Sequence, residues 1–325
     1  IERTENIFGK GWTPEIDTMD TFVCSSWYYL RYLDNLNSKQ PFDSEIVNKM
    51  MPVDLYIGGA EHATMHLLYA RFITKVLRDL KFVRFDEPFT KLYHQGTITK
   101  DGAKMSKSRG NTVSPDKFIN EYGSDVFRCY LMFMGPFDEG GDWNDKGITG
   151  ISKFLNKIFT ILSKEEGESA KEDTKVIHKT LKSVTQDLDN FKFNTAISKM
   201  MEMANSLVSS KALSKSDKYI INIMISPFAP HLGEEIWNSI LNETDSIFNA
   251  NWPDYDNELI VDDDFKIAVQ VNGKLRGSLL ISKNSTKDQI FSMSKDIENV
   301  SRHLDGGELV KEIYVPGKIV NFVIK

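Results

Sequence analysis

Two lysines in a short polar segment are the side chains of this sequence best suited to chemistry on a phosphate. Lys104 and Lys107 belong to the run Lys-Met-Ser-Lys-Ser, together with Met105, Ser106 and Ser108, and a glycine stands near each end of the run. Glycine lets a loop bend, and a lysine ammonium is a compact, mobile charge with three hydrogen-bond donors. Such a loop could hold two positive charges against a polyphosphate. Read alone, the five residues fit a solvated surface loop better.

A glycine turn ahead of a long helical pattern is the second candidate site. Residues 53–57 form an apolar run that predicts a buried strand, and Gly58 and Gly59 follow it. A helix is expected from about residue 61 to residue 80, beginning with Glu61. A turn of this kind lets a ligand approach the backbone at a helix N-terminus, which suits anions.

Two histidines lie at the start of the same helical pattern. His62 and His66 are four residues apart, so they are expected on one face of the helix. A third ligand of the right kind is missing nearby, so no metal site is predicted. A metal-dependent hydrolase built on this pair is therefore an alternative that an analysis for bound metal would exclude.

Short strands and helices alternate around both candidate sites. Further strands are expected at residues 82–85 and 92–98, and the second of these runs ends in Gly96, Thr97 and Ile98. This alternation predicts a doubly wound parallel sheet whose ligand lies beyond the carboxyl ends of the strands. Residues 1–17 are polar and mixed, and they are expected to form a loop or the tail of a segment that is missing.

The remaining chain predicts helices followed by a small mixed domain. Apolar stripes at residues 148–162 and 176–241 predict a bundle of about four antiparallel helices. From residue 265 the order ββαββ is expected, with Asn272-Gly273 as a hairpin turn and a single helical stripe over residues 290–304. Lys274 and Arg276 are expected on one face of a strand.

Composition excludes several classes of protein. The chain has 325 residues and a net charge of −6, but the segment from residue 265 onward carries ten Lys or Arg and six Asp or Glu. Local rather than general contact with nucleic acid is therefore expected. No apolar run is long enough for a membrane span, and Cys24 and Cys129 form neither a disulfide framework nor a metal cluster, so a cytoplasmic, reducing compartment is expected.

Four stretches, taken in order, resemble the leucyl-tRNA synthetase branch of the class I aminoacyl-tRNA synthetases. One is the lysine run, which matches the second ATP-binding motif of the class. The others are residues 20–32, 56–69 and 269–277. Residues 20–32 are rich in aromatic side chains and predict a short helix with the hydroxyls of Ser25 and Ser26 as N-cap candidates. One such motif could arise by chance, whereas four in the order of the family are hard to explain otherwise.

The resemblance implies a multidomain α/β plus all-α architecture. It divides the chain into the C-terminal half of a Rossmann-like catalytic domain (1–115), connecting helices (116–147), a helical anticodon-binding bundle (148–245), a linker with an acidic run (246–264) and a small α+β tRNA-contacting domain (265–325).

The resemblance also implies a set of ligands and contacts. ATP with Mg²⁺ activates leucine, and the leucyl group passes to tRNA-Leu, with Lys104 and Lys107 as the catalytic residues. ATP is expected at Gly58, Gly59, Glu61, Gly96, Thr97, Ile98, Met105, Ser106 and Ser108. Leucine is expected at Phe22, Ser25, Tyr28, His62 and His66, and tRNA at Lys274 and Arg276. Cys24 stands where relatives usually carry an acidic residue.

Parts of the family pattern are missing from the sequence. It contains no His-x-Gly-His, the first ATP motif of the class, and neither the editing domain nor the first half of the catalytic fold. The chain is therefore expected to be an expressed fragment, or one chain of a split enzyme that an N-terminal half completes, and to be inactive alone. The alternatives are a non-catalytic tRNA-binding module and a valyl- or isoleucyl-type fragment, which would share the lysine run.

Overall fold

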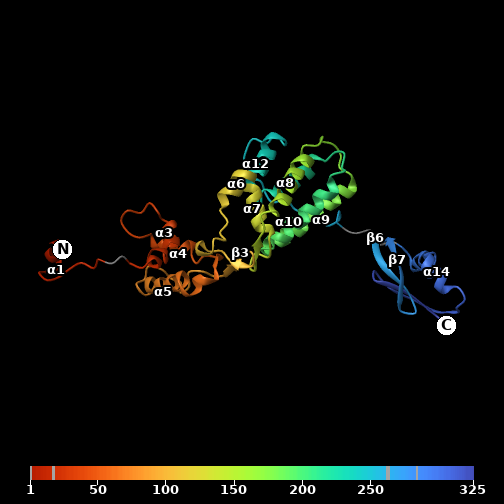
Figure 1. Cartoon of the computed structure of the whole chain (residues 1–325), viewed down its shortest axis with the longest axis horizontal. Helices are drawn as coiled ribbons and strands as arrows, with labels where there is room; N and C mark the ends of the chain where they lie inside the picture. Colours follow the sequence, from red (N-terminus) through yellow and green to blue (C-terminus); the bar gives the residue numbers. More distant parts are fainter. Residues whose placement is uncertain (1, 17–18, 261–263, 283–284) are drawn as a thin grey trace. The chain divides into compact units, whose positions relative to one another are not determined.

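The computed structural model describes residues 2–16, 19–260, 264–282 and 285–325 (Figure 1). Its contacts divide the chain into two units, one made of residues 1–168 and 182–252 and the other of residues 169–181 and 253–325. The domain boundaries expected from the sequence stay a prediction, and Asp262 and Asp263 of the expected linker lie outside the described residues. None of the described helices is both long enough and apolar enough to cross a membrane.

The first unit begins with short helices. They are α1 (Glu2–Phe8), α2 (Thr21–Ser25), α3 (Tyr28–Tyr32) and α4 (Ser44–Met50). The expectation of a loop over residues 1–17 is wrong for α1. The expected N-caps are also wrong, because α3 follows Trp27 without a side-chain cap. The carboxylate of Asp20 caps α2 by accepting from the Phe22 N–H at 2.8 Å. The hydroxyls of Ser25 and Ser26 instead donate to carbonyls within the helix, at 3.2 and 2.6 Å.

Two small sheets follow, and α5 (His66–Asp79) connects the strands of the first. In that sheet β1 (Tyr56–Gly59) pairs in parallel with β2 (Leu92–Gln95). In the second, β3 (Thr97–Lys100) pairs antiparallel with β4 (Ala103–Lys104) and in parallel with β5 (Gly140–Trp143). The expected strand at residues 82–85 is absent from this described region. Val83 is instead buried in the α3–α5 core as part of a loop, so its apolar character reflects packing rather than strand pairing.

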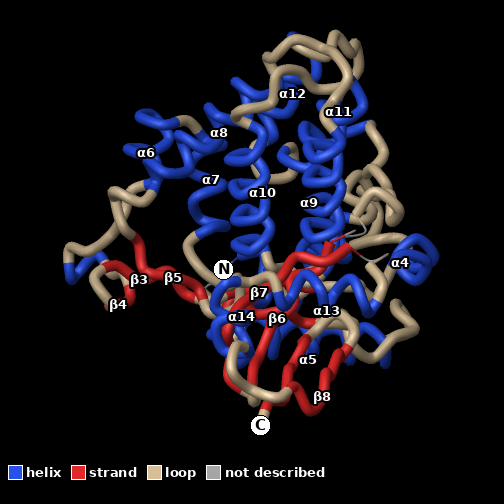
Figure 2. The backbone as a smooth tube through the Cα atoms, turned by 90° about the vertical axis from the view of Figure 1, so that its right-hand side faces the viewer, coloured by secondary structure: helices blue, strands red, loops and turns tan. Residues whose placement is uncertain are grey.

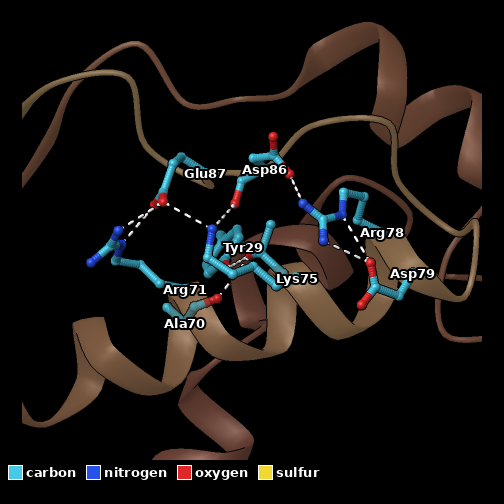
Figure 3. Close-up of polar contacts among 9 residues, drawn as sticks. Tyr29, Ala70, Arg71, Lys75, Arg78, Asp79, Asp86 and Glu87 are labelled. Carbon is cyan, nitrogen blue, oxygen red and sulfur yellow. Dashed lines mark hydrogen bonds and ion pairs between the residues drawn. The ribbon is translucent and has the colours of Figure 1, made fainter.

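Ion pairs fasten α5 to the segment that leads into β2 (Figure 3). Arg71 holds Glu87 through two hydrogen bonds of 2.7 and 2.8 Å, and the Lys75 ammonium lies 3.1 Å from the same carboxylate. One turn farther along, Arg78 pairs with Asp86. The three cations are spaced at i, i+4 and i+7, which places them along one side of the helix. This side of α5 therefore fixes where β2 begins.

Helices make up the rest of the first unit. They are α6 (Pro115–Tyr122), α7 (Ser124–Phe133), α8 (Ile148–Leu162), α9 (Lys171–Asp189), α10 (Phe193–Leu207), α11 (Lys215–Ile225) and α12 (Pro230–Ser239). Only the part of α9 from residue 182 onward belongs to the first unit. The helix expected at residues 148–162 is confirmed, and α7, α8 and α10 lie side by side (Figure 2). Five helices replace the expected four or so, because Pro230 starts a new helix.

The second unit contains a four-stranded sheet in the order β7-β6-β9-β8. Its elements are β6 (Asp264–Val271), β7 (Lys274–Ser282), α13 (Lys287–Lys295), α14 (Glu298–Leu304), β8 (Leu309–Val315) and β9 (Ile319–Ile324). The Asn272-Gly273 turn is confirmed, with φ values of 50° and 75°. The single helix expected at residues 290–304 is wrong. The chain turns at Ile297, so two short helices bring Ile290 and Val300 onto the sheet and the order is ββααββ.

A β-bulge interrupts β7 at the expected tRNA-contacting residues. Val269 pairs with Gly277 while Gln270 pairs with Leu275, so Arg276 is the extra residue on this strand. Alternation along the strand therefore does not by itself decide whether Lys274 and Arg276 share a face, and that expectation stays a prediction. Gly277 lies against the helices, where an added Cβ would come within 2.9 Å of the Ile297 side chain.

Candidate active site

The lysine loop joins the β3–β4 hairpin to α6. Lys104 is the last residue of β4, and residues Lys107–Arg109 form one turn of 3₁₀-helix. Ser106 caps this turn, because its Oγ accepts from the Arg109 N–H at 3.2 Å and lies 3.0 Å from the Ser108 Oγ. The hydroxyl residues thus shape the loop from within, and the lysine side chains extend from it.

Asn111 closes the lysine loop, a role that sequence reasoning missed. Its Oδ1 accepts from the Ser106 N–H at 2.9 Å, and its Nδ2 donates to the Lys104 carbonyl at 3.3 Å. One amide side chain therefore joins the two ends of the loop. The available signal was an asparagine directly after Gly110, whose φ of 69° marks a turn.

The hairpin that carries Lys104 is held by an aspartate from β5. Asp142 Oδ1 accepts from the Gly102 N–H at 3.0 Å and from the Thr99 hydroxyl at 2.5 Å. These hydrogen bonds, first that of Thr99 and then that of the Gly102 backbone, lower the pKa of Asp142 below its ordinary value. The carboxylate stays ionised at neutral pH and fixes the turn that aims the loop.

Three cations of the loop are free to meet an anion. Lys104, Lys107 and Arg109 are all exposed, and none of them forms an ion pair with any residue that the structure describes. Met105 is half-buried and anchors the segment between the lysines. An exposed loop with unpaired ammonium groups suits a polyphosphate, because no intramolecular partner has to be displaced first.

The two glycines that end β1 make room for a carboxylate, so the expected turn at Gly58 and Gly59 is instead part of the strand. Glu61 folds back over Gly59, so that a Cβ built on Gly59 would lie 2.5 Å from Glu61 Oε2. No atom comes within 4 Å of the corresponding position at Gly58. The end of β1 therefore presents an exposed carboxylate and an open backbone at the carboxyl end of a parallel strand, where α/β sheets bind ligands.

Gly96 has a packing role that the sequence did not reveal. Its N–H donates to the Phe137 carbonyl at 2.8 Å, and a Cβ at this position would lie 2.0 Å from the Gly140 nitrogen. The glycine lets the loop between α7 and β5 approach the backbone. Its N–H is therefore not available to a nucleotide, whereas Thr97 and Ile98 remain candidates at the start of β3.

The two histidines lie on different helices, so the expectation of one helix face is wrong. His62 belongs to a 3₁₀ segment (Ala60–Thr64) and His66 opens α5, with a break at Met65 where φ is −120° and ψ is −107°. Their rings still meet, with centroids 6.2 Å apart at 80°. Phe22 from α2 packs edge-on against His62 at 6.3 Å, so the expected aromatic and histidine side chains are brought together.

A hydrogen-bonded chain of side chains extends this cluster. Tyr28 Oη lies 2.7 Å from Tyr56 Oη, which lies 2.8 Å from His66 Nε2. Burial and the bond to Tyr28 raise the pKa of Tyr56, and burial followed by the nearby His62 lowers the pKa of His66. Tyr56 and His66 are therefore neutral at pH 7. Sequence reasoning treated Tyr56 only as a strand residue and missed its place in the site.

Two buried nitrogens in this cluster lack partners. The Nδ1 atoms of His62 and His66 are both shielded from solvent and form no hydrogen bond in the structure. Buried polar atoms are almost always satisfied, so each of these nitrogens needs a partner from outside the described residues. Ser25 does not contribute its hydroxyl, which donates to the Phe22 carbonyl. The described residues contain no group of three side chains that could hold a metal ion.

The expected tRNA-contacting residues lie in the second unit. Lys274 is exposed at the hairpin, and the Arg276 carbonyl accepts from Asn299 Nδ2 at 2.8 Å. The Arg276 Nε is buried and forms no hydrogen bond within the described part of the chain. The bulge thus ties the Arg276 backbone to α14 and leaves part of its guanidinium unsatisfied.

Two family models match the chain. That of the class I tRNA synthetases (I, L, M and V) matches residues 12–144, and that of the anticodon-binding domain of tRNA ligase matches residues 174–291. A leucine–tRNA ligase of Caldanaerobacter subterraneus subsp. tengcongensis is 48% identical over 95% of this chain and 40% of its own length. One of Clostridium perfringens strain 13 is 47% identical over 98% of this chain and 41% of its own.

Solved structures agree with these matches. The Agrobacterium radiobacter K84 agnB2 LeuRS in its ternary complex with tRNA and LeuAMS aligns with a TM-score of 0.75 at 35% identity, over 96% of this chain and 43% of that one. Methionyl-tRNA synthetase of Mycobacterium tuberculosis aligns with a TM-score of 0.50 at 21% identity over 67% of this chain and 49% of that one, which shows a shared fold only.

The chain spans about 40% of the length of the curated relatives that it matches. Both matched models fall in the order that the sequence motifs follow, and the multidomain α/β plus all-α architecture is confirmed. The chain therefore belongs to the class I aminoacyl-tRNA synthetases, as the C-terminal portion of a leucine–tRNA ligase.

Proposed function

We propose that this chain supplies one half of the active site of a leucine–tRNA ligase. The supporting observation is the pair of unpartnered, buried histidine nitrogens beside Phe22 and Tyr28, in the same unit as an unpaired lysine loop. The histidines offer polar contacts for leucine or its adenylate, and the aromatic rings offer an apolar wall. The lysine loop offers charge for ATP. Together they fit activation of an apolar amino acid on a nucleotide.

In the proposed reaction the leucine carboxylate attacks the α-phosphate of ATP and pyrophosphate leaves. A ribose hydroxyl at the end of tRNA-Leu then attacks the leucyl carbonyl of the adenylate, so that an ester forms and AMP leaves. Negative charge builds on the phosphate oxygens in the first step, and Lys104 and Lys107 stabilise it. Removing one such electrostatic donor typically costs about 2.7–4 kcal/mol of barrier, or on the order of 100- to 1000-fold in rate.

We expect ATP to contact exposed backbone and side chains at the end of β1 and the start of β3. Glu61 would accept from the ribose hydroxyls, beside the backbone of Gly58 and Gly59, while Thr97 and Ile98 run along the base. Met105, Ser106 and Ser108 set the shape of the loop over the phosphates.

Mg²⁺ fits this site as a companion of the nucleotide. Mg²⁺ commonly takes most of its oxygen ligands from substrate phosphates and water and needs few from the protein, so the absence of a three-ligand cluster among the described residues is compatible with it. When bound, the ion would neutralise charge on the phosphates. The chain's own lysines approach the same phosphates from the loop.

A further polypeptide segment would complete the sheet. β1 pairs with β2 on one side only within the described residues, and its Ile57 side chain is 41% exposed. A parallel pair of two strands is too small to be stable by itself and is normally covered on both faces. We infer that the N-terminal half of the enzyme packs here and brings the missing first ATP motif.

Leucine-dependent exchange of pyrophosphate into ATP tests the proposal. The chain alone is expected to be inactive. Adding the N-terminal portion of the Caldanaerobacter relative as a separate polypeptide is expected to give exchange with leucine, which Lys107→Ala lowers on the order of 100-fold or more. Exchange that prefers valine or isoleucine would instead assign the chain to another branch. A stable two-chain complex that binds tRNA without any exchange would support the non-catalytic module.

A further inference from the structure

A second cavity of the first unit lies apart from the lysine loop and the histidines. Its volume is about 300 Å³, and it opens between β2, the loop after α7 and the turn that joins α9 to α10. Its walls include Tyr93, Phe137 and Phe191 from these three segments. Pockets of this size are at the small end of those that hold ligands. The proposed amino-acid activation uses none of these residues.

The aromatic rings that line the cavity are close to parallel and stack on one another. The rings of Tyr93 and Phe191 lie 4.9 Å apart at 30°, and those of Tyr93 and Phe137 lie 5.7 Å apart at 20°. Aromatic pairs in cores often meet edge to face, but here three rings share one orientation. A wall of parallel rings suits a flat partner that can stack, and every nucleobase presents such a face.

Unused polar groups converge on the same cavity. Asn190 donates through Nδ2 to the Gln186 carbonyl at 2.7 Å, which leaves its Oδ1 as a free acceptor. The Lys192 ammonium and the Asn194 amide, which also line the cavity, form no hydrogen bond or ion pair with the described residues. The amides can read the edge of a base, and the single lysine matches the single charge of a phosphodiester.

The backbone of Phe191 adopts a left-handed conformation that residues other than glycine disfavour. The turn after α9 is a Schellman motif, since the Lys192 N–H bonds to the Asp187 carbonyl at 2.8 Å and the Phe191 N–H to the Leu188 carbonyl at 3.1 Å. The residue in the left-handed position, with φ of 57°, is Phe191, where glycine is usual. The ring is thereby fixed at the mouth of the turn.

We propose that this cavity binds one unpaired nucleotide of the tRNA, with its base stacked on the Tyr93–Phe191 wall and its phosphate at Lys192. This inference rests on the proposed function, which supplies the tRNA. A free ATP molecule fits less well, because its triphosphate needs several cations, whereas this cavity offers one lysine and also contains Asp138. Proteins read unpaired nucleotides by this combination of aromatic stacking and amide hydrogen bonds.

Two variants separate the ring from the charge. Phe191→Gly removes the ring while keeping a residue that favours the left-handed backbone. Lys192→Gln removes the charge of an exposed side chain and keeps its approximate length. Phe248→Ala serves as the control, because Phe248 is an exposed aromatic residue outside the cavity. Thermal unfolding of each variant checks that the chain is folded.

Binding of a tRNA-Leu transcript to the 325-residue chain is then measured at fixed salt. Dimethyl sulfate and a carbodiimide report which bases are protected. The unsubstituted chain is expected to protect at least one unpaired base from modification. In Phe191→Gly that base should become reactive again, and the Kd for the tRNA should rise about five- to hundredfold. Lys192→Gln should weaken binding. It should also reduce the slope of log K against the logarithm of the salt concentration by about one, as expected when one phosphate contact is lost. Phe248→Ala should change neither.

Three results would overturn the assignment. If Phe191→Gly and Lys192→Gln both bind and protect tRNA as the unsubstituted chain does, the cavity is not a nucleotide site and the proposed function stands. If AMP, used as the probe for free nucleotides, binds the chain but not Phe191→Gly while tRNA protection is unchanged, the cavity belongs to a free nucleotide. If the chain binds no tRNA at all, the proposed function fails together with the cavity.

Discussion

The hydroxyl of Tyr56 offers the sharpest test of how the site is held together. It lies between Tyr28 Oη at 2.7 Å and His66 Nε2 at 2.8 Å, while its ring stacks on Phe89 with centroids 3.8 Å apart and an interplanar angle of 6°. Tyr56→Phe removes the hydroxyl and keeps the ring. The substitution therefore isolates the two hydrogen bonds from the packing.

The expected loss of stability follows from these two bonds. A neutral hydrogen bond contributes about 0.5–1.5 kcal/mol net, and a buried partner left unsatisfied costs about 1–3 kcal/mol. His66 is buried and would lose its one partner, since its Nδ1 already has none, whereas Tyr28 is half-buried and can turn to water. We expect Tyr56→Phe to lower the free energy of unfolding by about 1–3 kcal/mol.

Urea unfolding followed by tryptophan fluorescence measures this loss, because Trp27 packs against the core that contains Tyr29 and Leu30. Tyr69→Phe is the matched control, since no hydrogen bond joins the Tyr69 hydroxyl to a described residue, and it should shift stability by less than about 0.5 kcal/mol. A double-mutant cycle with Tyr28→Phe should give a coupling of about 0.5–1.5 kcal/mol. Equal losses in Tyr56→Phe and Tyr69→Phe, or zero coupling, would refute the reasoning.

Three further substitutions test other parts of the structure. The pKa of Glu87 is lowered to about 2 from its ordinary 4.5, chiefly by Arg71, so its carboxylate stabilises the fold above about pH 4.5 and that contribution is lost as the pH falls toward 2. Glu87→Gln should lower the free energy of unfolding by about 0.5–1 kcal/mol at pH 7, a small loss because the exposed ion pair with Arg71 is screened by solvent. The loss should be smaller at pH 3. Urea unfolding that gives an equal loss at both pH values would contradict this. Asn111→Ala should change the free energy of unfolding by less than about 0.5 kcal/mol. It should slow pyrophosphate exchange by the completed enzyme about tenfold or more, because the amide no longer joins the two ends of the lysine loop. An unchanged rate would show that the loop does not need this amide. Gly96→Ala should destabilise the chain by at least about 1–3 kcal/mol in thermal unfolding, because its Cβ meets backbone, whereas Gly58→Ala, with open space around it, should not; similar effects would refute the packing role.

Local patterns in the sequence were enough for several elements. The limits of α8 and the Asn272-Gly273 turn follow from neighbouring residues, and the structure bears them out. The lysine run and the three motifs that accompany it also carried the family, because they are read in order along the chain and need no contacts.

Tertiary structure decided what the local patterns left open or misassigned. Val83 belongs to a loop because its burial comes from α3 to α5, and the helical stripe after residue 286 splits at Ile297 because both halves must reach one sheet face. The bulge at Arg276 likewise depends on how β6 pairs with β7. A periodic pattern records which residues are apolar, and it does not record which surface they meet.

The sequence by itself determined the family, the lysines and the histidines of the candidate site. Only the tertiary structure brought Tyr56 to His66, Asp142 to the turn at Gly102, and Phe137 to Gly96, across separations of 10, 40 and 41 residues. The physical reason is that a residue type limits the bonds that a side chain can form, whereas the packed fold selects its partner.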